Sequence, residues 1–323
     1  ISLFNGVPIE VLTQTVLERV GNESEILESI QKLDEFSLLS SNESDKISLY
    51  PLVHTLVGKN VLSNPNTAIY LEIDAAFAWD NFTHQVLDTK EEPLGVYLEL
   101  IASNWHHIRL AVETFYKYAT QGKLSMEEGE TWYQDIAYDL MFMDIVIRLL
   151  EFMLHSGYWQ ELIHYGQMAY ELAVQEEVWE NAYFVAYEIA WVYGKNYRND
   201  VTNAEIWVAR TFDAAEKSEW KWYQAEASRL QGLLNYQQGN VSEGKLLLKQ
   251  AENQYQQLLG EFVEKDVKLA IARIEIDLAE IMFEADRQDP TAIEKWESAL
   301  QLHQEYDGPK ECQSAILGNC GDW

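Results

Sequence analysis

Apolar residues recur at helical spacing along most of this chain, so the pattern predicts a largely helical protein. It predicts helices over 9–20, 24–39, 68–87 and 94–119, with Asn22 or Ser24 available to cap the second. No proline lies between Pro93 and Pro290. Because proline costs about 3 kcal/mol inside a helix, this stretch permits a long succession of stacked helices.

One short region alternates apolar and polar residues instead. The segments "SLLS" and "ISLY" flank the polar turn "SNESD", which predicts a β-hairpin within residues 37–50. Pro51 ends the alternation, and "PLVHTLV" then reads as a helix. Helix, helix, strand, turn, strand is the order of a winged helix, which we expect over residues 1–60. Residues 58–67 have the composition of a linker.

Small residues recur at fixed spacing further along. Gly232, Gly239, Gly244 and Ala251 are separated by 7, 5 and 7 residues. Gly157 and Ala169 each lie 82 residues before Gly239 and Ala251, which fits two periods of about 41 residues. We expect such residues where the two helices of a hairpin touch, since larger side chains would separate them.

Two further copies of the pattern are present. Ala292, Trp296 and Ala299 repeat the spacing of the second helix, and Ala190 and Ala204 fit a copy with an ambiguous register. Residues 125–305 therefore resemble the tetratricopeptide repeat family. The resemblance implies an all-α fold, a right-handed superhelix of helical hairpins that binds polypeptides. The alternative is an irregular helical bundle.

The first 60 residues carry a second resemblance. "SLFNG" (2–6), the hairpin and "YPLV" (50–53) occur in the order found in the winged-helix module of NB-ARC (STAND) signal-transduction ATPases. In that family the module joins a nucleotide-binding core to a repeat array. The resemblance implies that Tyr50 stands at the nucleotide-sensing position, where the family has a histidine. Tyrosine can donate a hydrogen bond there but does not become cationic at neutral pH.

No G-x4-G-K-[ST] motif occurs in the chain. We therefore expect no cofactor in this chain, and the resemblance implies that ATP or ADP binds an upstream domain. The chain begins at Ile1 without a methionine or a signal peptide, so we expect a piece of a longer, cytoplasmic protein. The two cysteines, Cys312 and Cys320, fit a reducing compartment.

The charge argues against several partners. The chain has 53 acidic and 23 basic residues and a formal net charge of −30. Nucleic acid and anionic membranes need clustered lysine and arginine, so we expect neither as a partner. The predicted winged helix is itself acidic, with nine acidic residues against four basic ones in residues 1–60. Basic or aromatic peptides are compatible with this charge.

No residue pattern indicates an enzyme or a metal site. His106 and His107 are adjacent, so they point about 100° apart on a helix and do not share a metal ion easily. No HExxH, CxxC or nucleophile motif is present. We expect a non-catalytic chain; an enzyme with an all-α fold is the remaining alternative.

The helical spacing instead predicts a polypeptide-binding groove. If Ala190 and Gly232 occupy equivalent positions in the first helix of successive hairpins, one face of those helices carries aromatic and charged residues. These are Phe184, Tyr187, Trp191, Arg229, Tyr236, Arg273, Glu280 and Phe283. Tryptophan, tyrosine and arginine are common anchors at interfaces.

The predicted organisation has three parts. A winged-helix-like module spans 1–60, a linker and helical adaptor 61–124, and a tetratricopeptide-like array with a C-terminal cap 125–323. We expect the non-catalytic sensor and autoinhibitory region of a bacterial NB-ARC-type protein, with a polypeptide partner and an intramolecular nucleotide-binding domain. The alternative is a free-standing peptide receptor of the quorum-sensing type.

Overall fold

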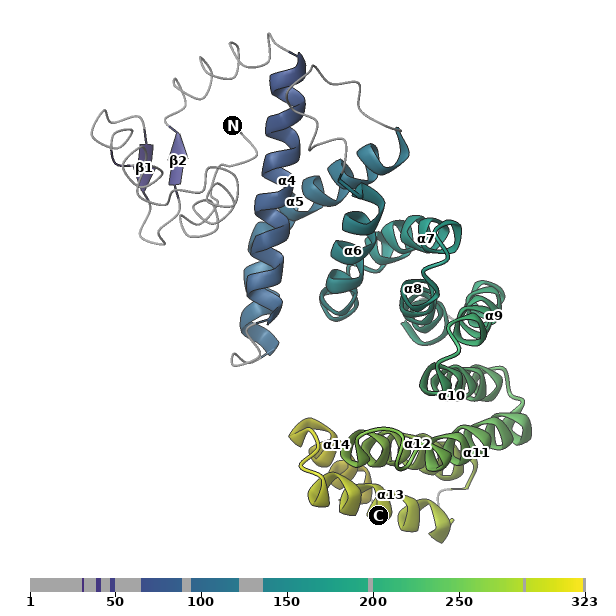
Figure 1. The fold of residues 1–323 in the computed structure, drawn as a ribbon. Helices are drawn as coiled ribbons and strands as arrows, with labels where there is room; N and C mark the ends of the chain where they lie inside the picture. The colour runs from purple at the N-terminus through teal and green to yellow at the C-terminus, as the bar shows by residue number, and fades with distance from the viewer. Residues whose placement is uncertain are drawn as a thin grey trace. The chain divides into compact units, whose positions relative to one another are not determined.

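The computed structural model describes residues 31, 39–41, 47–49, 65–88, 94–121, 136–196, 200–286 and 289–321 (Figure 1). The chain divides into two compact units, Ile1–Tyr158 and Trp159–Trp323, which we describe separately. The first contains the strands β1 (Leu39–Ser41) and β2 (Ile47–Leu49) and the helices α4 (Pro65–Asp88), α5 (Leu94–Thr120) and α6 (Tyr138–His155). No helix among the described residues has the length and apolar character needed to cross a bilayer.

The predicted β-hairpin is confirmed. Strands β1 and β2 pair antiparallel, with Leu39 opposite Leu49 and Ser41 opposite Ile47. The helices predicted over 9–20 and 24–39 lie almost entirely outside the described residues, and Tyr50 and the helix after Pro51 lie wholly outside them.

Helices α4, α5 and α6 share a core in the first unit. Both predicted helices, 68–87 and 94–119, are present, and α4 begins earlier than expected. Its first residue is Pro65, which lies in the stretch 58–67 whose composition predicts a linker. Proline is favoured at this position because its fixed φ suits the first turn, where its missing N–H has no partner to lose. The rings of Phe77 and Phe115 pack 5.3 Å apart between α4 and α5.

The second unit is a series of helices joined by short loops. They are α7 (Trp159–Gln175), α8 (Trp179–Trp191) with the π-helix η3 (Val192–Asn196), α9 (Val201–Lys217), α10 (Lys221–Gln237), α11 (Val241–Gln257), α12 (Glu264–Ala285), α13 (Pro290–Glu305) and α14 (Lys310–Gly321). The pairs α8/α9, α10/α11 and α12/α13 form hairpins, and each hairpin packs on the next. Helices α8, α10 and α12 also neighbour one another in that order. This arrangement is tetratricopeptide-like, as the small-residue spacing predicted.

Two glycines lie at the closest approach within a hairpin. A Cβ on Gly244 would lie 2.8 Å from the carbonyl oxygen of Gly232, and a Cβ on Gly232 would lie 3.1 Å from that of Gly244. Helices α10 and α11 therefore meet backbone to backbone. Other predicted small positions are buried in the second unit, namely Ala169, Ala190, Ala251, Ala292 and Ala299. Trp296 belongs to the same hydrophobic cluster as Ala299.

Gly157 and Gly239 have a different role from the one predicted. Each follows the end of a helix with a left-handed backbone, φ 78° and 84°, and a Cβ there would meet nothing within 4 Å. The amide of Asn240, just after Gly239, donates to the carbonyl of Asn235 over 2.9 Å, which closes the last turn of α10. These glycines are needed for backbone conformation and not for contact between helices.

Left-handed residues also follow helices α7, α9 and α11. Glu177, Glu219 and Gly260 have φ of 57°, 58° and 93°, and they follow one another at intervals of 42 and 41 residues. The predicted repeat length of about 41 residues is thus visible in the backbone. Two of these positions carry a glutamate, which is strained in this conformation.

Replacing Glu219 with glycine is expected to stabilise the second unit by about 1 kcal/mol, because glycine adopts a positive φ without steric cost. Chemical unfolding followed by far-UV circular dichroism measures the change. Glu219→Gln is the control, since it removes the charge and keeps the Cβ. Equal stabilisation by both variants would assign the effect to charge and contradict the strain argument.

Candidate functional site

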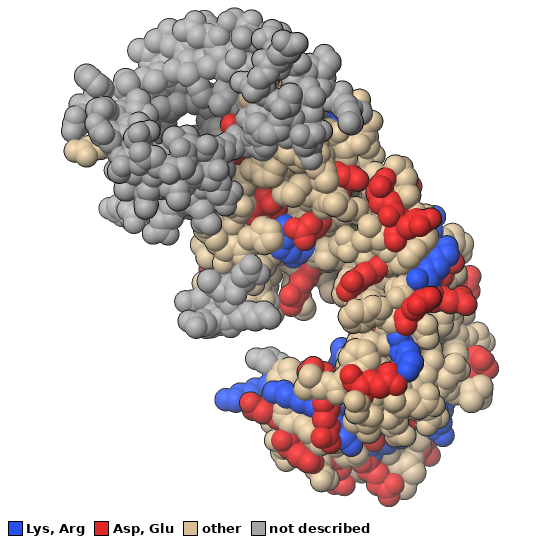
Figure 2. Space-filling view, in the orientation of Figure 1, with Lys and Arg blue, Asp and Glu red and all other residues tan. Residues whose placement is uncertain are grey.

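Three helices, α8, α10 and α12, carry aromatic and charged residues on the sides that face one another, and we call this surface the A-helix face. Helical spacing aligns its residues, which are Tyr187 and Trp191 on α8, Glu226, Arg229 and Tyr236 on α10, and Arg273, Asp277, Glu280 and Glu284 on α12. Acidic side chains are scattered over the described surface in Figure 2, with basic side chains between them. The distribution of charge over the surface therefore does not indicate where a binding site lies. The specific contacts on the A-helix face give that indication.

Glu226 is the centre of a buried polar network on this face. Its carboxylate accepts a hydrogen bond from the Tyr187 hydroxyl at 3.1 Å and from Arg273 Nη2 at 2.9 Å. Arg229 Nη1 lies 3.5 Å from the same carboxylate. Burial raises the pKa of Glu226, but Arg273 and Arg229 outweigh it and hold the pKa below its usual value. Glu226 is therefore an anion shared by three neighbours.

Arg229 joins α10 to α12. Its Nε donates to Asp277 at 2.6 Å, and both side chains are buried. Burial lowers the pKa of Arg229, yet the Asp277 carboxylate more than compensates and raises it well above its usual value. The ion pair between Arg229 on α10 and Asp277 on α12 thus holds these two helices of the A-helix face together.

An open cavity of about 520 Å³ lies at the end of this network. Its walls come from α8, α10, the turn after α10, the start of α11, and α12. The aromatic and apolar side chains in these walls include Trp191, Leu233 and Tyr236, and the acidic ones are Asp277, Glu280 and Glu284. Tyr236 donates a hydrogen bond to Glu284, and burial followed by this contact raises the pKa of Tyr236 to about 12. The volume is in the range of pockets that bind small ligands or single side chains.

The structure brings most of the predicted groove residues together. Tyr187, Trp191, Arg229, Tyr236, Arg273 and Glu280 belong to the network or the cavity. Phe283 differs from the prediction, because its ring packs 5.3 Å from Trp296 within the hairpin α12/α13. It is part of the hydrophobic core there and does not line the cavity.

Phe184 belongs to an aromatic cluster away from the cavity. Tyr223 stacks on Tyr183 at 4.2 Å and on Trp220 at 5.3 Å, and Phe184 meets Tyr223 edge-on at 5.4 Å. Phe184 and Trp220 remain 38% and 48% exposed. Aromatic residues of α8 and at the start of α10 are therefore also exposed outside the cavity.

Three acidic residues of the site were not predicted from the sequence, namely Glu226, Asp277 and Glu284. A signal was present in the spacing: Asp277 and Glu284 lie four and eleven residues after Arg273, on one side of a helix. With 53 acidic residues in the chain, that spacing did not separate them from solvent-exposed acids.

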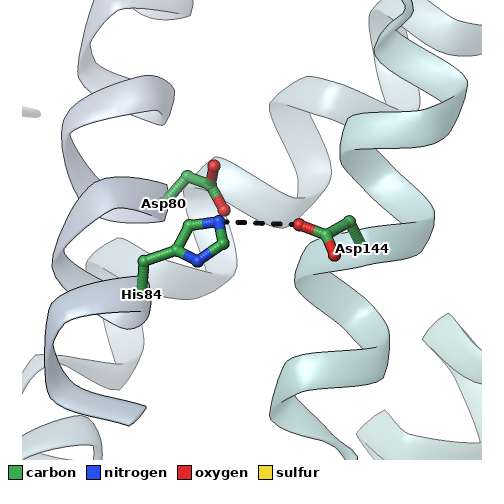
Figure 3. A group of neighbouring side chains, drawn as sticks. All are labelled: Asp80, His84 and Asp144. Atoms are coloured by element: carbon green, nitrogen blue, oxygen red, sulfur yellow. Dashed lines mark ion pairs between the residues drawn. The ribbon is translucent and has the colours of Figure 1, made fainter. Parts of the chain in front are cut away.

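A second polar cluster lies in the first unit, and Figure 3 shows three of its residues, Asp80, His84 and Asp144. His84 Nε2 is 3.6 Å from Asp144. Arg148 Nη2 bridges the two carboxylates, at 3.0 Å from Asp80 and in contact with Asp144, and its Nη1 donates to Thr83. Burial, partly offset by Arg148, raises the pKa of Asp80. A metal ion would have to displace this guanidinium, so the cluster is best described as an ion pair that fastens α6 to α4.

His303 is a buried histidine whose ring nitrogens have no hydrogen-bond partner among the residues that the structure describes. Burial, and then the charge of Arg273, lower its pKa below the ordinary value of 6.5. The folded state therefore favours the neutral ring. The stability it contributes is fully present above pH 6.5 and is lost as the pH falls through the folded-state pKa.

Replacing His303 with phenylalanine is expected to weaken the loss of stability as the pH falls below about 6.5, by up to about 1.4 kcal/mol per pH unit. Unfolding free energies measured at several pH values give the slope. His106→Gln, which replaces an exposed histidine, is the matched control for the loss of one histidine. A slope unaffected by His303→Phe would show that this ring does not titrate on unfolding.

The chain matches no protein-family model and no curated protein. Among solved structures, the crystal structure of a Rap protein complexed with competence and sporulation factor is similar, with a TM-score of 0.48 and 14% sequence identity. The similarity covers 82% of this chain and 73% of that chain. At these values it says nothing about what this chain binds, and function has to be inferred from the residues themselves.

Proposed function

We propose that this chain is a non-catalytic, polypeptide-binding receptor, and that the A-helix face of its second unit is the binding surface. The observation that carries the proposal is the open cavity of about 520 Å³ whose walls come from three successive hairpins. A pocket shared by neighbouring repeats suits an extended ligand, which contacts several repeats at once. Arg229 of the buried network lies 5.8 Å from the centre of the Trp191 ring, and Glu284 accepts a hydrogen bond from Tyr236. These contacts orient both aromatic side chains before binding, which lowers the entropic cost of association.

The test is a selection of displayed random peptides of about twelve residues on the immobilised chain, followed by affinity measurements on the enriched peptides. The double variant Trp191→Ala/Tyr236→Ala is expected to weaken binding about thirtyfold, as buried aromatic anchors do. The control Ile206→Ala/Leu246→Ala removes exposed apolar side chains from α9 and α11 and leaves binding unchanged. Absence of any binding peptide, or equal loss in both double variants, would reject the proposed surface.

For the wider protein, we propose a sensor and autoinhibitory region of a bacterial NB-ARC-type signalling protein in the cytoplasm. The antiparallel pairing of Leu39–Ser41 with Ile47–Leu49 supports it, since it is the pairing expected of the wing. An intramolecular nucleotide-binding domain would then be a second partner. A P-loop motif upstream in the complete reading frame is the expected finding.

The alternative is a free-standing peptide receptor of the quorum-sensing type. Its support is that the cavity and network lie wholly in the second unit, so peptide binding needs no further domain. A complete reading frame without a P-loop motif would favour this alternative. Both proposals keep the same binding surface.

A further inference from the structure

The cavity on the A-helix face has an excess of negative charge. Asp277, Glu280 and Glu284 line it, and no lysine or arginine is among its described lining residues. Arg229 neutralises Asp277 from behind, at 2.6 Å. Glu280 and Glu284 are exposed carboxylates that also line the cavity, and Glu284 accepts a hydrogen bond from the neutral hydroxyl of Tyr236.

Helix ends add to this negative potential. Tyr236, Gln237 and Gly239 bring the C-terminal end of α10 to the cavity, and Glu284 lies one residue before the end of α12. The last carbonyl groups of a helix carry a partial negative charge that favours cations. The partial charges of the backbone and the charges of the side chains thus both make the potential in the cavity negative. Acidic residues scattered at random over the surface would not coincide with helix ends in this way.

Most of the other lining residues are apolar or aromatic. Leu233, Val241 and Ile281 line the cavity together with Trp191, and Gln237 adds a neutral polar side chain. Lysine and arginine side chains need such a surface for their methylene groups and a polar end for their charge. The Trp191 ring already accepts one cation, because the guanidinium carbon of Arg229 lies 5.8 Å from its centre.

We infer that this cavity binds the side chain of a lysine or arginine residue in the polypeptide partner. The inference rests on the proposed function and specifies its ligand: a peptide with a basic residue that enters the cavity while its backbone lies along α8, α10 and α12. Neutral and acidic peptides would lack the group that Glu280 and Glu284 attract.

The first experiment uses N-acetyl-arginine methylamide as the probe and its neutral isostere N-acetyl-citrulline methylamide as the comparison. The full chain is labelled with 5-fluorotryptophan, and the Trp191 resonance is assigned in the fluorine NMR spectrum with Trp191→Phe. The arginine probe is expected to shift this resonance saturably, and the citrulline probe to bind about tenfold more weakly.

The variant Glu280→Gln/Glu284→Gln is expected to remove this preference, with about a tenfold loss of affinity for the arginine probe. The control Glu216→Gln/Glu297→Gln changes the net charge equally but alters exposed residues of α9 and α13. It leaves the affinity unchanged. Equal losses in both variants would mean that only the overall charge matters and would overturn the inference.

The remaining outcomes separate this inference from the proposed function. If selected peptides bind and the arginine probe leaves the Trp191 resonance unmoved, the cavity is not a basic subsite and polypeptide binding stands. If the arginine probe binds and is lost in Glu280→Gln/Glu284→Gln while no peptide binds, the subsite stands and the receptor function is wrong.

Discussion

Replacing Arg229 with methionine is expected to lower the free energy of unfolding of the second unit by about 3–5 kcal/mol, the cost of removing one partner from a buried ion pair. Asp277 would lose the 2.6 Å contact that compensates its charge, and Glu226 would keep only Arg273 as a cationic partner. Methionine has a similar length, so packing is largely kept. Chemical denaturation followed by circular dichroism measures the loss.

Two further variants make this prediction specific. Arg229→Met/Asp277→Leu is expected to recover most of the stability, because apolar residues of similar volume often replace a buried pair at little cost. Lys221→Met is the matched control, because it breaks an ion pair with Glu261 in which the two side chains are 60% and 50% exposed, respectively. It is expected to lower the free energy of unfolding by less than about 1 kcal/mol. A loss as small for Arg229→Met as for Lys221→Met would show that the network contributes little to stability.

Replacing Gly244 with alanine is expected to destabilise the hairpin α10/α11 by about 2 kcal/mol. The added methyl group would lie 2.8 Å from the Gly232 carbonyl oxygen and 3.1 Å from the Tyr236 amide nitrogen. These are backbone atoms, so the two helices have to separate, and overpacking of this kind costs about 1–3 kcal/mol. The gain of about 1 kcal/mol in helix propensity offsets part of it.

Gly194→Ala is the control for this substitution within the same unit. A Cβ there would meet Gln237 Oε1 at 3.5 Å, an ordinary contact distance. Thermal unfolding of both variants should show a lower melting temperature for Gly244→Ala alone. Equal melting temperatures would mean that α10 and α11 separate without cost, contrary to the close approach described above.

Much of the fold was predictable because it depends on local patterns. Apolar spacing located α4 and α5 to within a few residues, and turn residues between alternating segments located the hairpin β1/β2. Small residues identified where α10 and α11 touch. The role of Gly157 and Gly239 was not separable from packing in the sequence, since glycine serves both a close contact and a left-handed turn.

The register of the small residues in the hairpin α8/α9 was ambiguous in the sequence, and the structure gives a physical reason. Helix α8 does not end at a glycine turn; it continues into the five-residue π-helix Val192–Asn196. A π-helix adds residues to a turn, so the spacing between Ala190 and Ala204 departs from that of the other hairpins. Trp191, at the start of this irregular turn, lines the cavity.

The site was predictable in its aromatic and basic residues and not in its acidic ones. Tyr187, Trp191, Arg229 and Tyr236 are conspicuous on a helical face. Asp277 differs from the exposed acids only through the partner that lies on another hairpin, 48 residues away in sequence. Burial and pairing at that distance depend on how the hairpins stack, which single-helix spacing does not contain.

Charges shared between hairpins change how this array can come apart. Modules that touch only through apolar surfaces can open one at a time, from an end inward. Here Arg229 on α10 pairs with Asp277 on α12, and Arg273 on α12 pairs with Glu226 on α10, so separating these two hairpins would leave Asp277 without its cation and remove one of the two cations beside Glu226. Separating α8 from α10 would remove the neutral donor Tyr187 from Glu226. The hairpins α10/α11 and α12/α13 are therefore expected to unfold together, and a ligand that stabilises one of them stabilises both.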